Sequence, residues 1–439
     1  MHFYSTKDKS LKTSFKETVL QGIASDGGLF MPSIIPPLSG SFIESLPNLT
    51  FQEIAFEIAS LFIENEIPEQ ELLGIVEEAF NFPVIVKSLT DNLAVLELFH
   101  GPTLAFKDFG ARFTARVMSY LLRGEDRKVT ILVATSGDTG SAVANGFYNT
   151  EGINIVLLYP SGKVSNIQEK QLTTIGGNVT ALEVEGTFDD CQRLVKEAFM
   201  DKGLNNAMHL SSANSINFAR LLPQSFYYVY AYSKLKSRNN EIIFSVPSGN
   251  LGNLTAGLLA SEMGVPVKRF IGAVNANSVL SDYISSGKLN VRPSIQTISN
   301  AMDVGNPSNI ARIFDLYRDS YDAIKRIIFS TSISDERTRK GIREVYDYFS
   351  YVMDPHGAVA YEALRDYPEN LRDSSVSVIL ETAHPAKFPE VIEEALNIKV
   401  ETPERLAEVL KKEKRSVKIS HAFSDFKTFL MDTRRNLTK

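Results

Sequence analysis

The sequence predicts an open, largely parallel α/β architecture, with a helical region at the N-terminus and further helices at the C-terminus. From about residue 84 onward, short segments rich in β-branched residues alternate with longer helical segments. This alternation is typical of buried parallel strands joined by helices. The first 80 or so residues instead show helical periodicity, and a charged helical segment opens at residues 401–404.

Two helices are predicted within the N-terminal region, residues 1–83. Residues 51–63 place apolar side chains close to a 3.6-residue period, at Ile54, Ala55, Ile58, Leu61 and Phe62. Pro68 opens the second helix, expected over residues 69–80, and the Asn-Phe-Pro sequence that follows ends it.

The α/β part is expected to form two domains, because helical segments fill most of the intervals between the predicted strands. Strands are predicted at residues 94–99, 129–134, 155–159, 179–184, 242–246, 269–273 and 376–380. The larger domain would comprise residues 84–120 and 235–400, and the smaller one residues 121–234. Residues 401–439 would form a C-terminal helical appendage.

Composition and charge exclude several classes of protein. The 439 residues suffice for two or three domains with a large core, and a formal net charge of −6 argues against a dedicated nucleic-acid binder. A single cysteine, Cys191, excludes an intramolecular disulfide and a multi-cysteine zinc site. Neither a signal-peptide core nor an apolar stretch of membrane-spanning length is found. We therefore expect a soluble, cytoplasmic protein.

Lys107 is the first candidate for catalysis. It lies just after an apolar run and just before a helical pattern, among Leu104, Ala105, Phe106 and Phe109. Burial in such surroundings lowers the pKa of a lysine, as Schiff-base chemistry requires. Because a lysine beside apolar residues can also extend its charge to water, the prediction depends on motifs farther along the chain.

Two glycine-rich turns each follow a predicted strand and precede a helical segment. The first contains Thr135, Ser136, Gly137, Asp138 and Thr139, and the second contains Ser248, Gly249, Asn250, Leu251, Gly252 and Asn253. Converging backbone N–H groups at a helix N-terminus can hold an anion, although both turns could instead be plain tight connections. Neither matches the dinucleotide or P-loop pattern, so a nucleotide-driven enzyme is disfavoured.

A polar segment, residues 381–388, follows the last predicted strand and contains Thr382, His384 and Lys387. It is expected to be a site loop, although a capped helix start would look similar, and His384 and Lys387 could equally be exposed loop residues. The six histidines show no metal-ligand spacing, so no metal is expected. A Gly-x-Ser-x-Gly hydrolase turn is also missing from the sequence.

Taken together, these motifs resemble the fold-type II pyridoxal phosphate enzymes, and among them the threonine synthase family of the longer, bacterial and fungal kind. The lysine segment 102–109, the turns at 135–140 and 248–253 and the loop 382–388 occur in the same order. Four ordered motifs are far more specific than any one of them. The resemblance covers nearly the whole chain.

The resemblance implies a role for each motif. Lys107 would bind pyridoxal 5'-phosphate covalently and later carry protons as base and acid. The turn from Ser248 to Asn253 would hold the cofactor phosphate through backbone amides, with Ser248 and Asn253 as side-chain donors. Thr382 would lie at the pyridine nitrogen, where a hydroxyl cannot enforce protonation, so the ring suits elimination and replacement at the β and γ carbons.

The resemblance also implies the reaction, which releases phosphate from O-phospho-L-homoserine and adds water at Cβ to give L-threonine. The turn from Thr135 to Thr139 would hold the substrate carboxylate. Asp138 replaces an asparagine that many fold-type II enzymes direct at the ring O3′, where a carboxylate would repel a phenolate unless one group holds a proton. Asp138 is therefore assigned to the substrate turn only.

The substrate phosphate needs cationic or amide donors. Lys163, Asn217 and Arg220 are the candidates, although each could be a solvated surface group. The expected partner is this small-molecule substrate, with no nucleic acid and no membrane, and the protein is expected to be a monomer or homodimer.

Two alternatives stay open from the sequence. Another fold-type II enzyme, such as a serine or threonine dehydratase or a β-replacing synthase, shares the lysine and the phosphate turn but lacks the 382–388 loop and the N-terminal region. A catalytically inactive binding protein on the same fold is the other alternative, which an intact Lys107 and intact turns disfavour.

Overall fold

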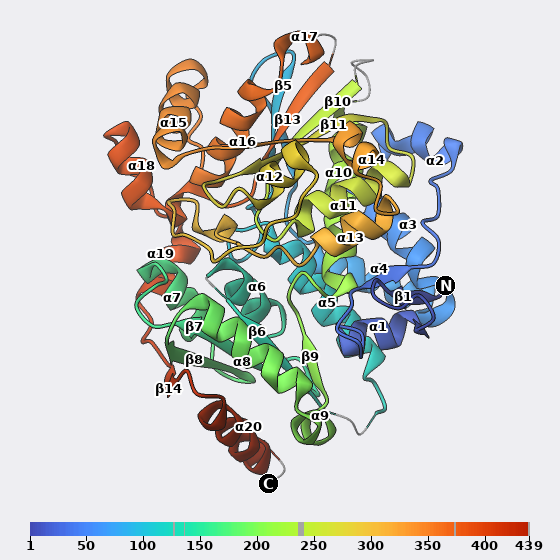
Figure 1. The fold of residues 1–439 in the computed structure, drawn as a ribbon, viewed down its shortest axis with the longest axis vertical. Coiled ribbons are helices and arrows are strands. Elements are labelled where there is room, and N and C mark those ends of the chain that lie inside the picture. Colours follow the sequence, from blue (N-terminus) through green and yellow to red (C-terminus); the bar gives the residue numbers. More distant parts are fainter. Residues whose placement is uncertain (126–127, 136, 236–240, 373–374, 438–439) are drawn as a thin grey trace.

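The computed structural model describes residues 1–125, 128–135, 137–235, 241–372 and 375–437. Figure 1 shows two α/β layers, one above the other, with the N-terminal segments along one side and the C-terminus at the lower end. The α/β architecture predicted from the alternation of strands and helices is confirmed.

The larger sheet has six strands and is parallel except for one edge strand, β4. In spatial order its strands are β12 (Ile328–Ser332), β11 (Val267–Val274), β10 (Glu241–Pro247), β13 (Ser375–Glu381), β5 (Leu93–Glu97) and β4 (Ile85–Ser88). The pairing of β5 with β13 joins the first and last long strands of this layer at the centre of the sheet. Strands β10 and β13 also pair in parallel, so their carboxyl ends lie side by side.

The smaller sheet has five strands, all parallel. In spatial order they are β14 (Val417–Ser420), β8 (Val179–Glu185), β7 (Ile153–Pro160), β6 (Val129–Ala134) and β9 (Leu210–Ser212). All six residues of β6 are buried, as expected of a central parallel strand.

The N-terminal region contains helices α1 (Phe15–Gln21), α2 (Gly40–Ser45), α3 (Phe51–Ile63) and α4 (Glu69–Ala79), with short 3₁₀ turns η1 (Leu46–Asn48) and η2 (Glu64–Glu66). The helices predicted at 51–63 and 69–80 are confirmed to within one residue. Helix α3 begins with a capping box in which Thr50 and Glu53 satisfy each other's backbone N–H groups. A helical description of this region is incomplete, because β1 (Phe3–Ser5), β2 (Lys12–Thr13) and β3 (Phe30–Pro32) form a small antiparallel sheet.

The helices between the layers form the main core. Helix α10 (Phe218–Leu235) packs against α3, α5 (Lys107–Leu121) and α11 (Gly252–Glu262). The remaining helices of the smaller layer are α6 (Asp138–Gly146), α7 (Asn166–Thr173), α8 (Phe188–Met200) and α9 (Lys202–Met208).

The remaining helices of the larger layer are α12 (Val279–Ser286), η4 (Asn300–Met302), α13 (Ile310–Leu316), α14 (Tyr321–Ile327), α15 (Asp335–Phe349), α16 (Pro355–Asp366), α17 (Glu369–Arg372), η5 (Pro385–Lys387) and α18 (Pro389–Leu396). The C-terminal segment contains α19 (Glu404–Leu410) and α20 (Phe423–Leu437), and its strand β14 extends the smaller sheet. In the described part of the chain, every helix is too short or too polar to cross a bilayer.

Candidate active site

A cavity of about 130 Å³ lies where the carboxyl ends of β6, β10 and β13 approach the N-termini of α5 and α11. The predicted site residues that line it are Lys107, Thr135, Thr139, Arg220, Gly249, Asn250, Leu251, Gly252, Asn253 and Thr382. A larger cavity of about 570 Å³ adjoins it and shares Ala134, Gln192, Asn214 and Asn250. The smaller cavity holds the reactive groups, and the larger one reaches the N-terminal segment and α13.

Lys107 and Thr382 are brought together by backbone hydrogen bonds between two segments far apart in sequence. Phe106 N–H donates to the carbonyl of Thr382 at 2.9 Å, and His384 N–H donates to the carbonyl of Leu104 at 3.0 Å. Leu104 adopts a left-handed conformation with φ of 59°, which turns the chain into this short antiparallel contact. Lys107 is therefore held directly beside the segment that follows β13.

The ammonium group of Lys107 faces the cavity in a setting that disfavours its charge. Burial lowers its pKa to about 8, with Lys387 and Arg220 lowering it further and Asp138 acting in the opposite direction. A lysine with a lowered pKa provides the neutral amine that attacks a carbonyl. Asp108, the next residue, accepts hydrogen bonds from the backbone and hydroxyl of Thr103 and so fixes the preceding loop.

The turn after β10 presents backbone to the cavity at close range. A Cβ atom on Gly249 would lie 2.8 Å from the Cα of Met302, and one on Gly252 would lie 3.1 Å from the Cβ of Ser215. Leu251 takes a left-handed conformation with φ of 60° just before α11 begins. The N-terminus of an eleven-residue helix is thus directed at the cavity, as an anion site requires.

The polar side chains of this turn have different tasks. The Ser248 hydroxyl donates to the carbonyl of Val246 at 2.8 Å, and Ser248 is not among the lining residues. Asn250 donates to the Ser215 hydroxyl and accepts from Ser308 N–H, so its amide is used in holding the loop. Only the Asn253 amide nitrogen is left buried without a partner.

The turn after β6 is stabilised from within. The Thr135 hydroxyl accepts from the backbone N–H groups of Gly137 and Gly140, at 3.0 and 2.9 Å. Gly137 has φ of 143°, and a Cβ there would lie 2.5 Å from the side chain of Gln168, so the position requires glycine. Ser136, a predicted substrate ligand, lies outside the described residues.

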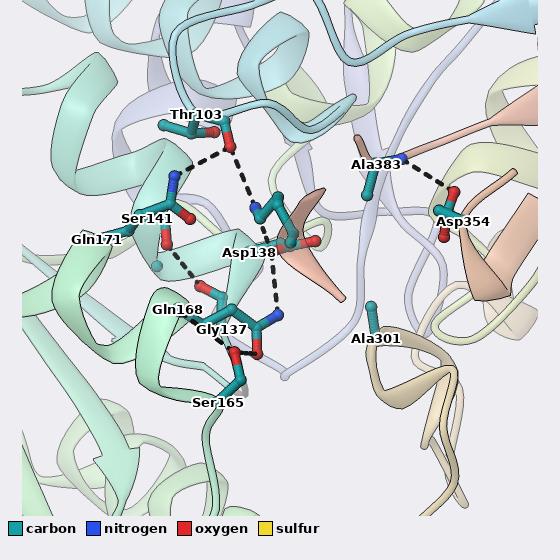
Figure 2. Close-up of polar contacts among 12 residues, drawn as sticks. Thr103, Gly137, Asp138, Ser141, Ser165, Gln168, Gln171, Ala301, Asp354 and Ala383 are labelled. Atoms are coloured by element: carbon teal, nitrogen blue, oxygen red, sulfur yellow. Dashed lines mark hydrogen bonds and ion pairs between the residues drawn. The ribbon is translucent and has the colours of Figure 1, made fainter. Parts of the chain in front are cut away.

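Asp138, labelled near the centre of Figure 2, forms a buried ion pair with Lys387. The Asp138 carboxylate is 2.6 Å from the Lys387 ammonium, which also donates to the carbonyl of Thr103 at 3.1 Å. Gln168 donates to the same carboxylate at 3.1 Å and accepts from Asn300 at 3.3 Å. Burial acts to raise the pKa of Asp138, but Lys387 and Lys107 outweigh it and hold that pKa well below the usual range.

The three predicted ligands of a substrate phosphate lie in different places. Arg220 is buried, lines the cavity, and leaves its Nε and Nη1 atoms without a hydrogen-bond partner. Asn217 is buried too, but its amide bonds to the carbonyls of Val19 and Ser212 and to the N–H of Ala219. Lys163 is exposed on the loop after β7 and is not a lining residue. The structure therefore brings only Arg220 to the cavity.

His356 and its neighbours are a part of the site that the sequence motifs did not indicate. His356 lines the cavity, its Nε2 accepts from Ala301 N–H at 3.2 Å, and its Nδ1 lies 2.5 Å from the Asp354 carboxylate. Asp354 also accepts weakly from Ala383 N–H, while its own backbone N–H donates to buried Glu381 (Figure 2 shows Asp354 and Ala383). Burial and then Asp354 raise the pKa of Glu381 well above its usual value.

The donors at this cavity fit a phosphorylated carbonyl cofactor. A lysine of lowered pKa, an amide cradle closed to side chains and an unpartnered guanidinium can bind an aldehyde and anions. Within the described residues, no group of three or more histidine, cysteine or acidic side chains could hold a metal ion.

Comparisons with known proteins identify the fold and the cofactor class together. Family models described as threonine synthase N terminus, pyridoxal-phosphate dependent enzyme, and threonine synthase C-terminal match residues 2–80, 85–382 and 357–430. Threonine synthase of Serratia marcescens is 43% identical over 98% of this chain and 99% of its own length. The Escherichia coli (strain K12) protein of that name is 44% identical, over 93% and 94%.

Solved structures agree with this assignment. A crystal structure of threonine synthase from Escherichia coli matches with a TM-score of 0.93 and 42% identity, over 99% of this chain and all of that one. A structure of PLP-bound threonine synthase from Brucella melitensis matches with a TM-score of 0.90 and 32% identity, over 99% of both chains. The predicted cofactor, pyridoxal 5'-phosphate, and the predicted small-molecule lyase chemistry are confirmed. This chain belongs to the threonine synthase family of pyridoxal phosphate-dependent enzymes.

Proposed function

We propose that this chain converts O-phospho-L-homoserine and water to L-threonine and phosphate, with Lys107 as the catalytic residue. The observation that supports this proposal is the position of Lys107, which faces the cavity beside Thr382 and near the unpartnered guanidinium of Arg220. One cavity thus offers a reactive amine and a separate cation for a leaving group.

The bound cofactor withdraws electrons from the substrate carbon skeleton. Lys107 binds the cofactor and, once free, moves protons at the substrate carbons, for which a pKa of about 8 is well placed. The amides of Gly249, Asn250, Leu251 and Gly252, together with Asn253, bind the cofactor phosphate. Thr382, which lines the same cavity, would hold the pyridine nitrogen.

The turn after β6 binds the substrate carboxylate at the N-terminus of α6, with Thr135 and Thr139 facing the cavity. Ser136, Gly137 and Asp138 belong to the same turn. Asp138 acts through its ion pair with Lys387 and does not line the cavity. This pairing removes the repulsion expected of an unpaired carboxylate near a phenolate.

Arg220 binds the phosphate that leaves the substrate. Its burial lowers its pKa to about 10, so it stays charged at neutral pH. A desolvated cation without a protein partner is costly, and a dianionic ligand would supply that partner. Lys163 and Asn217 were also predicted to bind the substrate phosphate. Their positions in the fold do not favour that role.

The test is a comparison of substrates on the purified, cofactor-loaded protein. We expect phosphate and threonine to form from O-phospho-L-homoserine and no keto acid to form from L-serine. Faster deamination of serine or threonine would instead support a dehydratase. A threonine deaminase from Solanum lycopersicum matches this chain with only 15% identity and a TM-score of 0.55, which indicates a shared fold.

Location and assembly complete the proposal. We infer a cytoplasmic enzyme that is a monomer or homodimer, binds no nucleic acid and acts away from membranes. A net charge of −6 supports the part of this proposal that concerns nucleic acid. Sedimentation of the loaded protein measures the assembly state directly.

A further inference from the structure

Asn253 occupies the second position of α11 and is 95% buried, since 5% of its surface is exposed. Its Oδ1 atom accepts from the hydroxyl of Tyr227 at 2.6 Å and from the hydroxyl of Tyr228 at 2.8 Å. Its Nδ2 atom has no hydrogen-bond partner within the protein, and Asn253 lines the cavity. The amide is therefore held at one end only.

The distances indicate which end the tyrosines hold. A separation of 2.6 Å is ordinary between two oxygens but short for an amide nitrogen and an oxygen. The hydroxyl of Tyr228 also lies 3.0 Å from the backbone carbonyl of Asn253, so its single hydrogen is shared between that carbonyl and Oδ1. The orientation of the amide is therefore indicated mainly by the bond from Tyr227. Burial raises the pKa of both phenols well above the usual value, so both remain protonated donors.

The two phenols cannot follow Asn253 if its amide rotates. Both rings are fully buried on α10, and their centroids lie 5.1 Å apart. Phe109 packs at 5.3 Å against Tyr227, and Phe244 at 4.9 Å against Tyr228. Gly257 lets α11 approach this pair, because a Cβ there would lie 2.8 Å from the ring of Tyr228.

We propose that Tyr227 and Tyr228 are positioning residues that hold the Asn253 amide with its N–H donors toward the cavity, where they select a ligand carrying a phosphate. The inference rests on the proposed function, which places the cofactor phosphate at this helix N-terminus. Without the two hydroxyls the amide can rotate and present its carbonyl oxygen to the anion. Loss of an N–H donor, or its replacement by the carbonyl oxygen, should weaken binding of the ligand's phosphate but not of the rest of the ligand.

The experiment compares the affinities of the cofactor-free protein for pyridoxal 5'-phosphate and for pyridoxal, which carries the same aldehyde without the phosphate. Isothermal calorimetry on the full chain gives both dissociation constants, and their ratio isolates the phosphate. For a Tyr227→Phe, Tyr228→Phe double variant we expect this ratio to fall about tenfold, the typical worth of one hydrogen bond to a charged group. Tyr232→Phe, on the same helix and also buried, is the matched control and should leave the ratio unchanged.

Coupling to Asn253 separates positioning from a general loss of structure. In an Asn253→Ala background, removing the two hydroxyls should change the ratio no further. A double variant with the wild-type ratio, or with equal losses for both ligands, would overturn the inference.

Gly252→Val distinguishes the failure of this inference from the failure of the proposed site. If Gly252→Val lowers the ratio while the tyrosine variants do not, the cradle stands and the positioning role is wrong. If neither change alters the ratio, the phosphate binds elsewhere and both are wrong.

Discussion

The two glycine turns at the cavity have similar backbone roles but different electrostatics, since one is neutral and the other carries an ion pair. The turn after β10 faces the cavity with amide donors, and its Asn253 is held by two neutral phenols. The turn after β6 instead carries the buried ion pair of Asp138 and Lys387, which lies behind the cavity lining.

The difference teaches where charge is tolerated near a buried lysine. Asp138 acts to raise the pKa of Lys107 and Lys387 acts to lower it, so their pairing largely offsets the two effects. The turn after β10 offers an anion only dipoles, which keep their direction at every pH. Burial is therefore the main cause of the lowered pKa of Lys107, to which the turn after β6 adds two opposing charges. The turn after β10 provides a pH-independent place for a phosphate.

Lys107→Ala is the most severe way to break the comparison, because it removes the group that both turns surround. We expect turnover to fall at least about 10³-fold, within the range that positioned acid–base groups contribute. The fold should persist, since the residue faces a cavity. Steady-state kinetics and far-ultraviolet circular dichroism check both statements. Borohydride reduction followed by peptide mapping must label Lys107, and a label on another lysine would contradict the assignment.

Lys387→Met tests whether the turn after β6 depends on its charge. Removing one partner leaves the Asp138 carboxylate buried and unpaired, which typically costs about 3–5 kcal/mol of unfolding free energy. Lys387→Met combined with Asp138→Leu should recover most of that loss. Lys340→Met, which breaks an exposed pair with Glu344, is the control and should cost less than about 1 kcal/mol. Denaturant unfolding measures all three, and equal losses in the single and double variants would contradict the idea.

Arg220→Met tests the proposed role of Arg220, which belongs to neither turn, in binding the substrate phosphate. We expect weaker binding of the phosphorylated substrate, by about 2–5 kcal/mol as for other desolvated charge pairs. The absorption spectrum of the resting holoenzyme should not change. Lys163→Met is the matched control, since Lys163 is exposed and away from the cavity. A full effect in Lys163→Met with none in Arg220→Met would reverse the assignment.

A further test sharpens the comparison through pH. Lys107 has a pKa of about 8 in the folded protein against 10.5 as its usual value. Between these pH values the unfolded chain binds one proton more, so the cofactor-free protein gains stability as pH rises across the interval. Lys107→Met should remove this gain, which unfolding free energies measured from pH 7 to 11 will show.

Substitutions in the two turns should then differ in their effect on that interval. Asp138→Asn should move its lower limit below pH 8, and Lys387→Met should move it above, because the two charges act in opposite directions on Lys107. Asn253→Ala, in the neutral turn, should move it in neither direction. A shift of similar size in all three variants would show that the turns do not differ as described.

The sequence carried the central features of the fold because these depend on local patterns. Buried strands such as β6 and β10 are mostly apolar, and both glycine turns follow such runs. Four strands of the two larger sheets, β4, β9, β12 and β14, were missed; they are three to five residues long, too short for a clear periodic signal. Strand β14 also pairs with β8, which lies far away in sequence.

The candidate site, like the fold, was predicted where it depends on local sequence patterns. Lys107 and the two turns are recognisable from their neighbours in the chain, whereas partnerships across the fold are not. Lys387 was weighed as an exposed loop residue, yet its side chain is fully buried against Asp138. His356 was given no role because its partner is the backbone of Ala301, which has no signature in sequence.

The backbone contact between Leu104 and His384 also determines when the site can form during synthesis of the chain. A ribosome completes the Lys107 segment long before the residues that hold it, since Thr382 and His384 lie near the end of the larger layer. Strand β5 likewise cannot pair with β13, its neighbour in the sheet, until β13 has been synthesised. A nascent chain that ends before residue 381 contains Lys107 but lacks the segment that packs beside it. We therefore expect cofactor capture to be a late event in synthesis, and a prematurely terminated chain not to retain the cofactor.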